Sequence, residues 1–306
     1  SIMDYNGYDI SCNGYNDGAI ESSVNGSLPP YSLSWNTGQN TDALTDLTSG
    51  TYTLQITDLN NCILTDFIEL TEPLALNTSI QSAFDYNGYD ISCYNYSDGG
   101  VELSINGGIE PYSTFWNNGE TLEDLNGLTS GDYSVSILDQ NNCPDSNLIT
   151  LNQPTELVLN FSASDYNGYN ISCNGLNDGT INALIIGSVP PYTYEWSNGL
   201  NTQNLYLLSS ANYNLEISDL NNCQIADSLF LTEPNDFFVN LSYASDTCGR
   251  GVGSASTSVT PEFNPYSYQW SNGEISSEVN NLYAGQNSVI VTDIYLSLIH
   301  ISEPTR

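Results

Sequence analysis

The sequence predicts an all-β fold, a tandem array of immunoglobulin-like β-sandwich modules of about 80 residues each. The segment Asp-Tyr-Asn-Gly-Tyr begins at Asp4, Asp85 and Asp165, and tryptophans recur with nearly the same period. Strand-like segments follow at matched positions in each copy. This period is too long for a helical solenoid unit and suits a small β-domain. The tryptophans expected in the module cores are Trp35, Trp116, Trp196 and Trp270.

The first two expected strands of the first copy are short. Residues 19–24 follow an Asn-Asp-Gly turn, and such residues commonly precede a strand. In residues 31–35, which follow Pro29-Pro30, apolar residues alternate with serines up to Trp35. Alternation with a period of two is typical of a half-buried strand. The same pattern returns in the third copy at residues 192–196.

The later strands show this periodicity more clearly. In residues 51–58, three apolar residues alternate with threonine and glutamine. Residues 63–70 have the composition of a last strand, and residues 74–80 that of the first strand of the next copy. No segment shows a helical period of 3.6. Short strands at this spacing, with a tryptophan on a central strand, favour a sandwich, and a small β-barrel is the alternative.

Proline marks the expected boundaries, at Glu72-Pro73, Gln153-Pro154 and Glu233-Pro234. Proline cannot donate to a strand ladder and restricts the residue before it, so these are short joints without a flexible spacer. We therefore expect a semi-rigid rod. The expected modules are residues 1–73, shortened at the N-terminal end, then 74–154, 155–234, and a divergent fourth copy at 235–295, shortened at the C-terminal end.

Residues 296–306 break the repeat. Their sequence resembles the in-frame translation of a transposase sequencing adapter, so we expect this segment not to be native and to take no part in the fold. A genuine divergent tail is the alternative. The segment contains His300, the only histidine, and Arg306, one of two basic residues.

Composition excludes several classes of function. The chain has 36 acidic and 2 basic residues, a net charge of −34, so nucleic acid and anionic lipid are poor partners. No apolar run is long enough to predict a membrane span. Without lysine, and without histidine outside the adapter-like segment, neither a catalytic triad nor a Schiff base can form. The acidic residues recur in register in every copy, which is unusual for an active site, so we expect no enzyme activity.

The cysteines recur with the repeat and suggest an oxidising exterior. Within each of the first three copies two cysteines lie 50 positions apart, which favours pairing inside each module. Buried reduced thiols are the alternative, and zinc is disfavoured because no close cysteine pair exists. The expected disulfides are Cys12-Cys62, Cys93-Cys143 and Cys173-Cys223, with Cys248 left unpaired because its partner would fall near residue 297.

No cofactor is required by this pattern, and calcium is the one the sequence allows. Oxygen-rich loops containing glycine suit a hard cation that takes six to eight ligands. The spacing is not that of an EF-hand, and the alternative is that these side chains cap their own turns. The candidate ligands are Asp4, Asn6, Asp9 and Asp17 in the first copy, Asp85, Asn87 and Asp98 in the second, and Asp165, Asn167 and Asp178 in the third.

The combined motifs resemble the SprB repeat of large surface adhesins from gliding and related Bacteroidota. The matching segments are Ile-Ser-Cys-Asn-Gly from Ile10, Asn-Asp-Gly from Asn16, Pro-Tyr at Pro30 through Trp35, Gly-Thr-Tyr from Gly50 through Asp58, Asn-Cys at Asn61, and Thr-Glu-Pro from Thr71. The resemblance implies type IX secretion, a cell-surface or secreted location, and a role in adhesion or gliding. The fourth copy departs from the pattern in its first loop, which has Cys-Gly-Arg-Gly from Cys248.

Three functions remain open at this stage. The leading hypothesis is a structural stalk of a large extracellular adhesin, in which the partners of each module are the neighbouring repeats of the same chain. The second is multivalent binding of surface polysaccharide, for which Tyr5, Tyr8 and Tyr15 are the candidate contacts. The third is an accessory region of a secreted enzyme.

Overall fold

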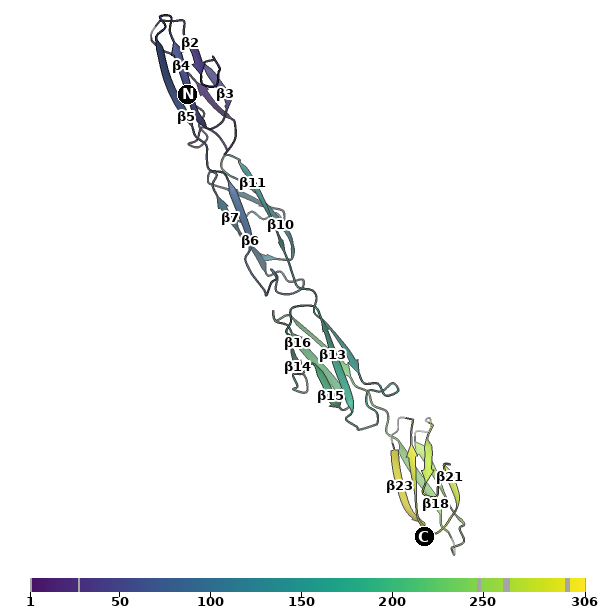
Figure 1. Ribbon diagram of the computed structural model, residues 1–306. Coiled ribbons are helices and arrows are strands. Elements are labelled where there is room, and N and C mark those ends of the chain that lie inside the picture. The colour runs from purple at the N-terminus through teal and green to yellow at the C-terminus, as the bar shows by residue number, and fades with distance from the viewer. Residues whose placement is uncertain (1, 27, 247–248, 261–264, 295–297, 306) are drawn as a thin grey trace. The chain divides into compact units, whose positions relative to one another are not determined.

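The computed structural model describes residues 2–26, 28–246, 249–260, 265–294 and 298–305. Every element in these residues is a β-strand, and they contain no helix that could span a membrane. The chain divides into two compact units, Ser1–Thr155 and Glu156–Arg306, and each contains two copies of the repeat (Figure 1). The all-β prediction is confirmed.

The second copy shows the complete arrangement. One sheet has the order β6-β7-β9 and the other β11-β10-β8, with all neighbours antiparallel. Strands one, two and four of the copy thus form one sheet, and the other three form the second, as in immunoglobulin-type sandwiches. The strands are β6 (Asn77–Ser82), β7 (Gly99–Asn106), β8 (Ser113–Trp116), β9 (Leu125–Leu128), β10 (Gly131–Leu138) and β11 (Pro144–Leu151).

The third and fourth copies repeat this order. The third has β12 (Val158–Ala163), β13 (Gly179–Ile186), β14 (Thr193–Trp196), β15 (Asn204–Leu208), β16 (Asn212–Ser218) and β17 (Gln224–Phe230). The fourth has β18 (Phe238–Ala244), β19 (Gly253–Thr260), β20 (Ser267–Trp270), β21 (Glu278–Leu282), β22 (Gly285–Thr292) and β23 (Leu298–Thr305).

The first copy has one strand fewer among its described residues. Its second sheet, β2-β4-β5, is complete, but the first contains only β1 and β3, with no strand in the place of β6. Its strands are β1 (Gly18–Glu21), β2 (Ser32–Trp35), β3 (Ala43–Leu47), β4 (Gly50–Thr57) and β5 (Ile63–Leu70). Sequence analysis found all of these except β3.

Each copy buries its own hydrophobic core between its two sheets. The tryptophans lie in these cores with 2–5% of their surface exposed, as predicted. Each indole is oriented by one hydrogen bond from Nε1 to a backbone carbonyl six residues later, so its polar edge is satisfied although it is buried. These pairs are Trp35 to Thr41, Trp116 to Leu122, Trp196 to Thr202 and Trp270 to Ser276.

The adapter-like segment takes part in the fold. Leu298–Thr305 forms β23 and pairs antiparallel with β22, in the position that β11 occupies on β10. Ile299 and Ile301 pack against the fourth core, which explains why an alternating apolar segment is accepted at this edge. The expectation that residues 296–306 lie outside the fold is therefore wrong for this strand. The foreign origin of the segment stays a prediction.

Candidate functional site at the junction between the first two repeats

The turn between the last two strands of the second copy is built around a buried aspartate. Asp139 Oδ1 accepts hydrogen bonds from the backbone N–H of Asn141 at 2.8 Å and of Cys143 at 2.9 Å. Its Oδ2 accepts a third from the backbone N–H of Ile109 at 2.9 Å. Asn142 has a φ of 63°, which lets the turn reverse within four residues. The carboxylate thus fixes the positions of Asn141 and Cys143, the two residues that contact the first copy.

The same turn occurs in the first and third copies. Asp58 accepts from the backbone N–H of Asn60 and Cys62, and Asp219 accepts from those of Asn221 and Cys223. Sequence analysis recognised these aspartates as recurring in register but assigned them no role. Their Asp-x-Asn-Asn-Cys spacing was the signal for a side-chain-capped turn.

The first loop of the first copy, residues 4–17, is held in shape by its own side chains. Asp4 Oδ1 accepts from the backbone N–H of Gly7 at 2.7 Å, and the Tyr5 hydroxyl donates to the Asp17 carbonyl at 3.4 Å. Asp17 in turn accepts from both the backbone N–H and the hydroxyl of Ser11. The repeated Asp-Tyr-Asn-Gly segment is therefore a structured turn.

This first loop is anchored beside the linker that leads to the second copy. Glu72 accepts from the backbone N–H of Gly14 at 2.7 Å and from the Asn13 amide at 3.2 Å. The Asn13 amide also donates to the Pro73 carbonyl at 3.0 Å. Asp9 Oδ2 accepts from the backbone N–H and the hydroxyl of Thr71, at 2.7 and 2.8 Å.

The linker is also held by the second copy. The Gly108 backbone N–H donates to the Leu74 carbonyl at 2.9 Å. At Gly107, which has a φ of 74°, a Cβ would lie 2.0 Å from the Ala75 carbonyl oxygen, so only glycine fits there. The Glu-Pro joint predicted from the sequence is therefore bonded to the copies on both sides.

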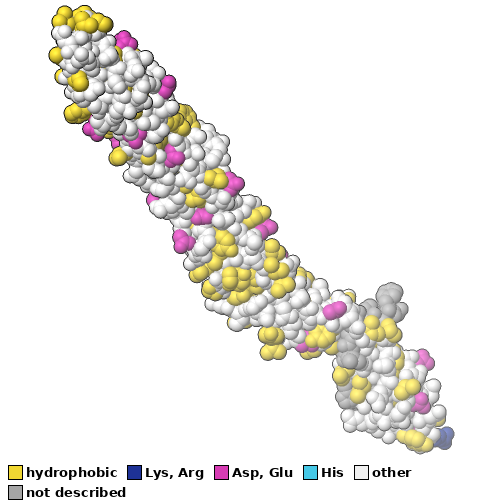
Figure 2. Space-filling model, turned by 45° about the horizontal axis from the view of Figure 1, so that its top comes forward, with side chains coloured by type: hydrophobic (Ala, Val, Ile, Leu, Met, Phe, Trp, Pro, Cys, Tyr) yellow, Lys and Arg dark blue, Asp and Glu magenta, His cyan; other side chains and the backbone are white. Residues whose placement is uncertain are grey.

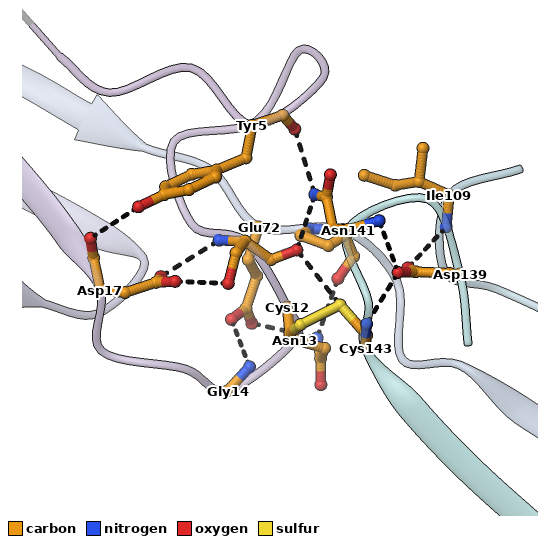
Figure 3. Close-up of a disulfide and its surroundings, with 12 residues drawn as sticks. Tyr5, Cys12, Asn13, Gly14, Asp17, Glu72, Ile109, Asp139, Asn141 and Cys143 are labelled. Atoms are coloured by element: carbon orange, nitrogen blue, oxygen red, sulfur yellow. Dashed lines mark hydrogen bonds between the residues drawn. A yellow bond between two sulfur atoms is a disulfide. The ribbon is translucent and has the colours of Figure 1, made fainter. Parts of the chain in front are cut away.

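At the junction, the capped turn of the second copy meets the first loop of the first copy (Figure 3). Cys143 forms a disulfide with Cys12, with a Cα–Cα distance of 5.6 Å. Next to it, the Asn141 amide donates to the Ser11 carbonyl at 2.8 Å and the Tyr5 carbonyl at 3.3 Å. Asn6 donates to the Asn141 side-chain oxygen. Both cysteines are buried, so the bond is protected from solvent.

This disulfide corrects the predicted pairing. Cys12-Cys62 and Cys93-Cys143 are wrong, because Cys12 bonds to Cys143 in the next copy and Cys62 is an exposed free thiol. Cys173-Cys223 is wrong as well, because Cys223 is disulfide-bonded whereas Cys173 is a thiol. Cys93 is also disulfide-bonded. Cys248 lies outside the described residues.

The physical reason is the length of β5. Cys62 precedes the first residue of β5, while the loop that carries Cys12 is bonded to Thr71, just beyond its last residue. An eight-residue strand spans about 27 Å at roughly 3.4 Å per residue. A disulfide requires Cα atoms within about 7 Å, so the two cysteines of one copy lie at opposite ends and cannot pair.

The candidate calcium ligands in the loops cap nearby turns, and calcium binding stays a prediction. The described residues contain no group of three or more acidic, histidine or cysteine side chains that could hold a metal ion. The candidate aspartates accept hydrogen bonds from nearby donors, and the three candidate asparagines have positive φ. The capping pairs are Asp4 with Gly7, Asp85 with Gly88, Asp165 with Gly168, Asp17 with Ser11, Asp98 with Ser92, Asp178 with Ser172, and Asp9 with Thr71; the asparagines are Asn6, Asn87 and Asn167.

The fourth copy uses a different aspartate in its first loop. Asp246 is buried and accepts from the backbone N–H of Arg250, Val252 and Ala284. The hydrogen bond from Val252, supported by those from Gly251, Ala284 and Arg250, holds the Asp246 pKa below its usual range despite the opposing effect of burial. One capping carboxylate thus replaces the Asp-Tyr-Asn-Gly turn in this copy.

Acidic side chains dominate the charge of the chain. Figure 2 shows acidic side chains scattered over the visible face rather than gathered in one patch. The sequence has only two basic residues against 36 acidic ones, so these carboxylates find few cationic partners. This distribution gives the molecule a diffuse negative field.

Comparison with protein families identifies the repeat. The model of the SprB repeat matches residues 8–40 and 169–201, and the chain therefore carries SprB repeats in its first and third copies. Both matches begin in the Asp-Tyr-Asn-Gly loop and end after the tryptophan strand. The resemblance identified from the sequence is confirmed for these two segments.

Several solved structures share low similarity with the chain. They include the N-terminal eight Ig domains of Down Syndrome Cell Adhesion Molecule (10% identity, TM-score 0.27, 96% of this chain and 67% of that one), Dpr2 Ig1-Ig2 in complex with DIP-Theta Ig1-Ig3 (9%, 0.26, 74% and 98%), and the insect immune protein hemolin (11%, 0.23, 95% and 95%). A search of curated proteins found no match.

Proposed function

From the SprB repeats that the chain carries, we propose that it is a structural repeat region, a stalk, of a large secreted or cell-surface adhesin. The observation that carries the proposal is the Cys12–Cys143 disulfide, which joins two consecutive copies rather than closing one. Such a bond persists in an oxidising exterior. The stalk supports adhesion by holding other parts of the molecule away from the cell.

The position of the bond suits a chain that carries tension. When the ends of the chain are pulled, force passes from residue 12 to residue 143 through the disulfide, and the segment between them is shielded, a sequence separation of 131. Strands β1 to β10 then lie outside the path of the force, whereas β11 of the second copy, which follows Cys143, remains in it. A stalk built in this way resists lengthening even if those shielded strands unfold.

Single-molecule force spectroscopy of the full chain tests this function. A residue adds at most about 3.6 Å when extended. With Cys93→Ser and Cys223→Ser present in both chains, so that no other disulfide shields this segment, the oxidised chain should release roughly 470 Å less contour length than the chain that also carries Cys12→Ser/Cys143→Ser. Cys62→Ser is the matched control, and it should behave as the unmodified chain. Equal contour lengths for the oxidised chain and the double variant would contradict the stalk mechanism.

Polysaccharide binding finds less support. Tyr5 and Tyr8 are half-buried, and the Tyr5 hydroxyl is used inside the first loop, which leaves Tyr15 as the exposed candidate. Export by type IX secretion and a part in gliding follow from the SprB resemblance alone. We propose no catalytic role, because the polar groups at the junction are engaged in hydrogen bonds that hold the first two copies together.

A further inference from the structure

The exposed side of one sheet in the third copy is apolar. This sheet has the order β12-β13-β15, and its other side packs on the third core. Four of its outward side chains are large, apolar and more than half exposed. We call them the apolar face: Leu184 and Ile186 on β13, with 58 and 54% of their surface exposed, and Tyr206 and Leu207 on β15, with 62 and 80%.

The other three copies have no apolar face at this place. The register of the strands gives the equivalent positions, because the core residue before Tyr206 pairs with β13 as its counterparts pair with β1, β7 and β19. Every equivalent residue is polar or glycine, so the fold of the repeat does not require large apolar side chains here. The equivalents are Ser23, Asn25, Thr45 and Asp46 in the first copy, Ser104, Asn106, Asn126 and Gly127 in the second, and Ser258, Thr260, Asn280 and Asn281 in the fourth.

Leu207 is also in a backbone conformation that does not suit leucine. Its φ is 57°, in the left-handed region, where the Cβ of most residues crowds the backbone. The other copies place Asp46, Gly127 and Asn281 at this position, with φ of 59, 70 and 58°, and these residue types adopt the conformation most readily. The Leu207 side chain gains little from packing inside the third copy, because most of it is exposed. The stability of the copy therefore does not account for a leucine here, and a contact with another molecule does.

The sheet that carries the apolar face is also free of charge. β12, β13 and β15 contain no acidic or basic residue, whereas each of the other seven sheets formed by the described residues has at least one acidic residue in its strands. On β13, Asn182 stands where the first two copies have Glu21 and Glu102. A carboxylate pressed against apolar side chains loses its hydration without gaining a cationic partner. In a chain with a net charge of −34, the surface that best fits the apolar face is therefore the same face of a second molecule.

We propose that two molecules of this chain associate through the apolar face of the third copy, each covering the other about a twofold axis. In such a contact the same side chains meet from both sides, so Leu184, Ile186, Tyr206 and Leu207 are buried twice. No carboxylate from the strands of either sheet enters the contact. The carboxylates elsewhere on the two chains repel one another, and salt screens this repulsion, so the association strengthens as the salt concentration rises. The contact joins two stalks at their third copies.

Sedimentation equilibrium of the full chain tests this association. Free thiols are first alkylated without reductant, so that no disulfide forms between molecules. We expect a monomer–dimer equilibrium whose dissociation constant falls by about tenfold between roughly 0.05 and 1 M salt. Asn182→Glu should weaken the dimer by at least about tenfold, because it places carboxylates of the two molecules in the contact. Leu207→Asn should weaken it as well, without lowering the unfolding temperature, because asparagine tolerates a positive φ.

Leu148→Ser is the matched control, because Leu148 is 59% exposed but lies in the second copy, and this variant should dimerise as the unmodified chain does. A chain that stays monomeric at about 1 mM would overturn the proposal. So would a dimer that Asn182→Glu and Leu207→Asn leave intact, or a Leu207→Asn variant that unfolds at a lower temperature, because the leucine would then serve the fold. Binding of the monomeric chain to a neutral polysaccharide, lost in Leu207→Asn, would assign the apolar face to a carbohydrate and overturn the second molecule as its partner.

Discussion

Asp139 lies where three backbone amides converge, and its carboxylate closes the turn that presents Asn141 and Cys143 to the first copy. A buried amide left without an acceptor costs about 1–3 kcal/mol. The residue therefore matters twice, for the stability of the second copy and for the geometry of the junction.

Asp139→Ala should destabilise the second copy by roughly 2–4 kcal/mol, because several amides lose their acceptor together. Asp139→Asn, which keeps one acceptor oxygen, should cost less. Chemical denaturation of both variants measures the difference. The alanine variant should also form the Cys12–Cys143 bond in lower yield on oxidative refolding. Wild-type stability together with wild-type yield would show that the carboxylate does not organise the turn.

Asp246 makes the first loop of the fourth copy sensitive to acid. Its folded pKa lies below that of an exposed aspartate, about 3.9, so its contribution to stability is complete above that value. The contribution is lost as the pH falls through the folded pKa. Acid should therefore loosen this loop in a pH range lower than that in which ordinary carboxylates titrate.

Amide chemical shifts of Val252 and Ala284 followed by NMR between pH 6 and about pH 2 measure this titration. We expect a midpoint below about 3.9 in the unmodified chain and no such transition in Asp246→Asn. A midpoint at or above the ordinary value would mean that the hydrogen bonds to Val252 and its neighbours do not stabilise the ionised carboxylate.

At the scale of single elements, the first copy has the same aspartate-capped turn, but within the described residues its cysteine forms no disulfide. Cys62 follows Asp58 as Cys143 follows Asp139, but its thiol is exposed. Pairing inside the copy would have made Cys62 unreactive. Pairing between copies and pairing within a copy therefore differ in the reactivity of the Cys62 thiol, which can be measured.

We expect Cys62 to react with a maleimide in the native chain without reductant, whereas Cys12 and Cys143 stay unmodified. Peptide mapping of the labelled chain after chymotryptic digestion identifies the modified cysteines, and Cys62→Ser removes the label at this position. An unlabelled Cys62, or labelled Cys12, would contradict the pairing between copies.

Most strands could be predicted because their apolar residues alternate. β3 was missed because Asp46 has a φ of 59° and the pairing of β1 with β3 shifts register between Gly18 and Ile20. The buried residues of β3, Leu44 and Leu47, are consequently three positions apart, and a search for a period of two overlooks them.

The disulfide could not be read from spacing alone. In each of the first three copies the two cysteines lie 50 positions apart. This spacing is the same whether they pair within a copy or with the next copy, so it does not distinguish the two arrangements. Strand direction was the usable signal. A last strand that starts beside one cysteine and ends near the loop of the other separates them by its whole length.

At the scale of the whole molecule, the covalent junction between the first two copies offsets the small size of each core and the repulsion between acidic copies. Each core is small, and a net charge of −34 opposes compact packing of the copies, an effect that salt screens. In the chain-entropy model, a bond closing 131 residues contributes at most about 5 kcal/mol. Hydrogen bonds from Asn141 and the anchored linker then define where the second copy sits on the first.

The central claim is that a disulfide joins the first two copies, and non-reducing peptide mapping of the full chain tests it most directly. Digestion and mass spectrometry without reductant should yield a peptide containing Cys12 linked to one containing Cys143, with Cys62 in an unlinked peptide. A peptide linking Cys12 to Cys62, or Cys93 to Cys143, would contradict it.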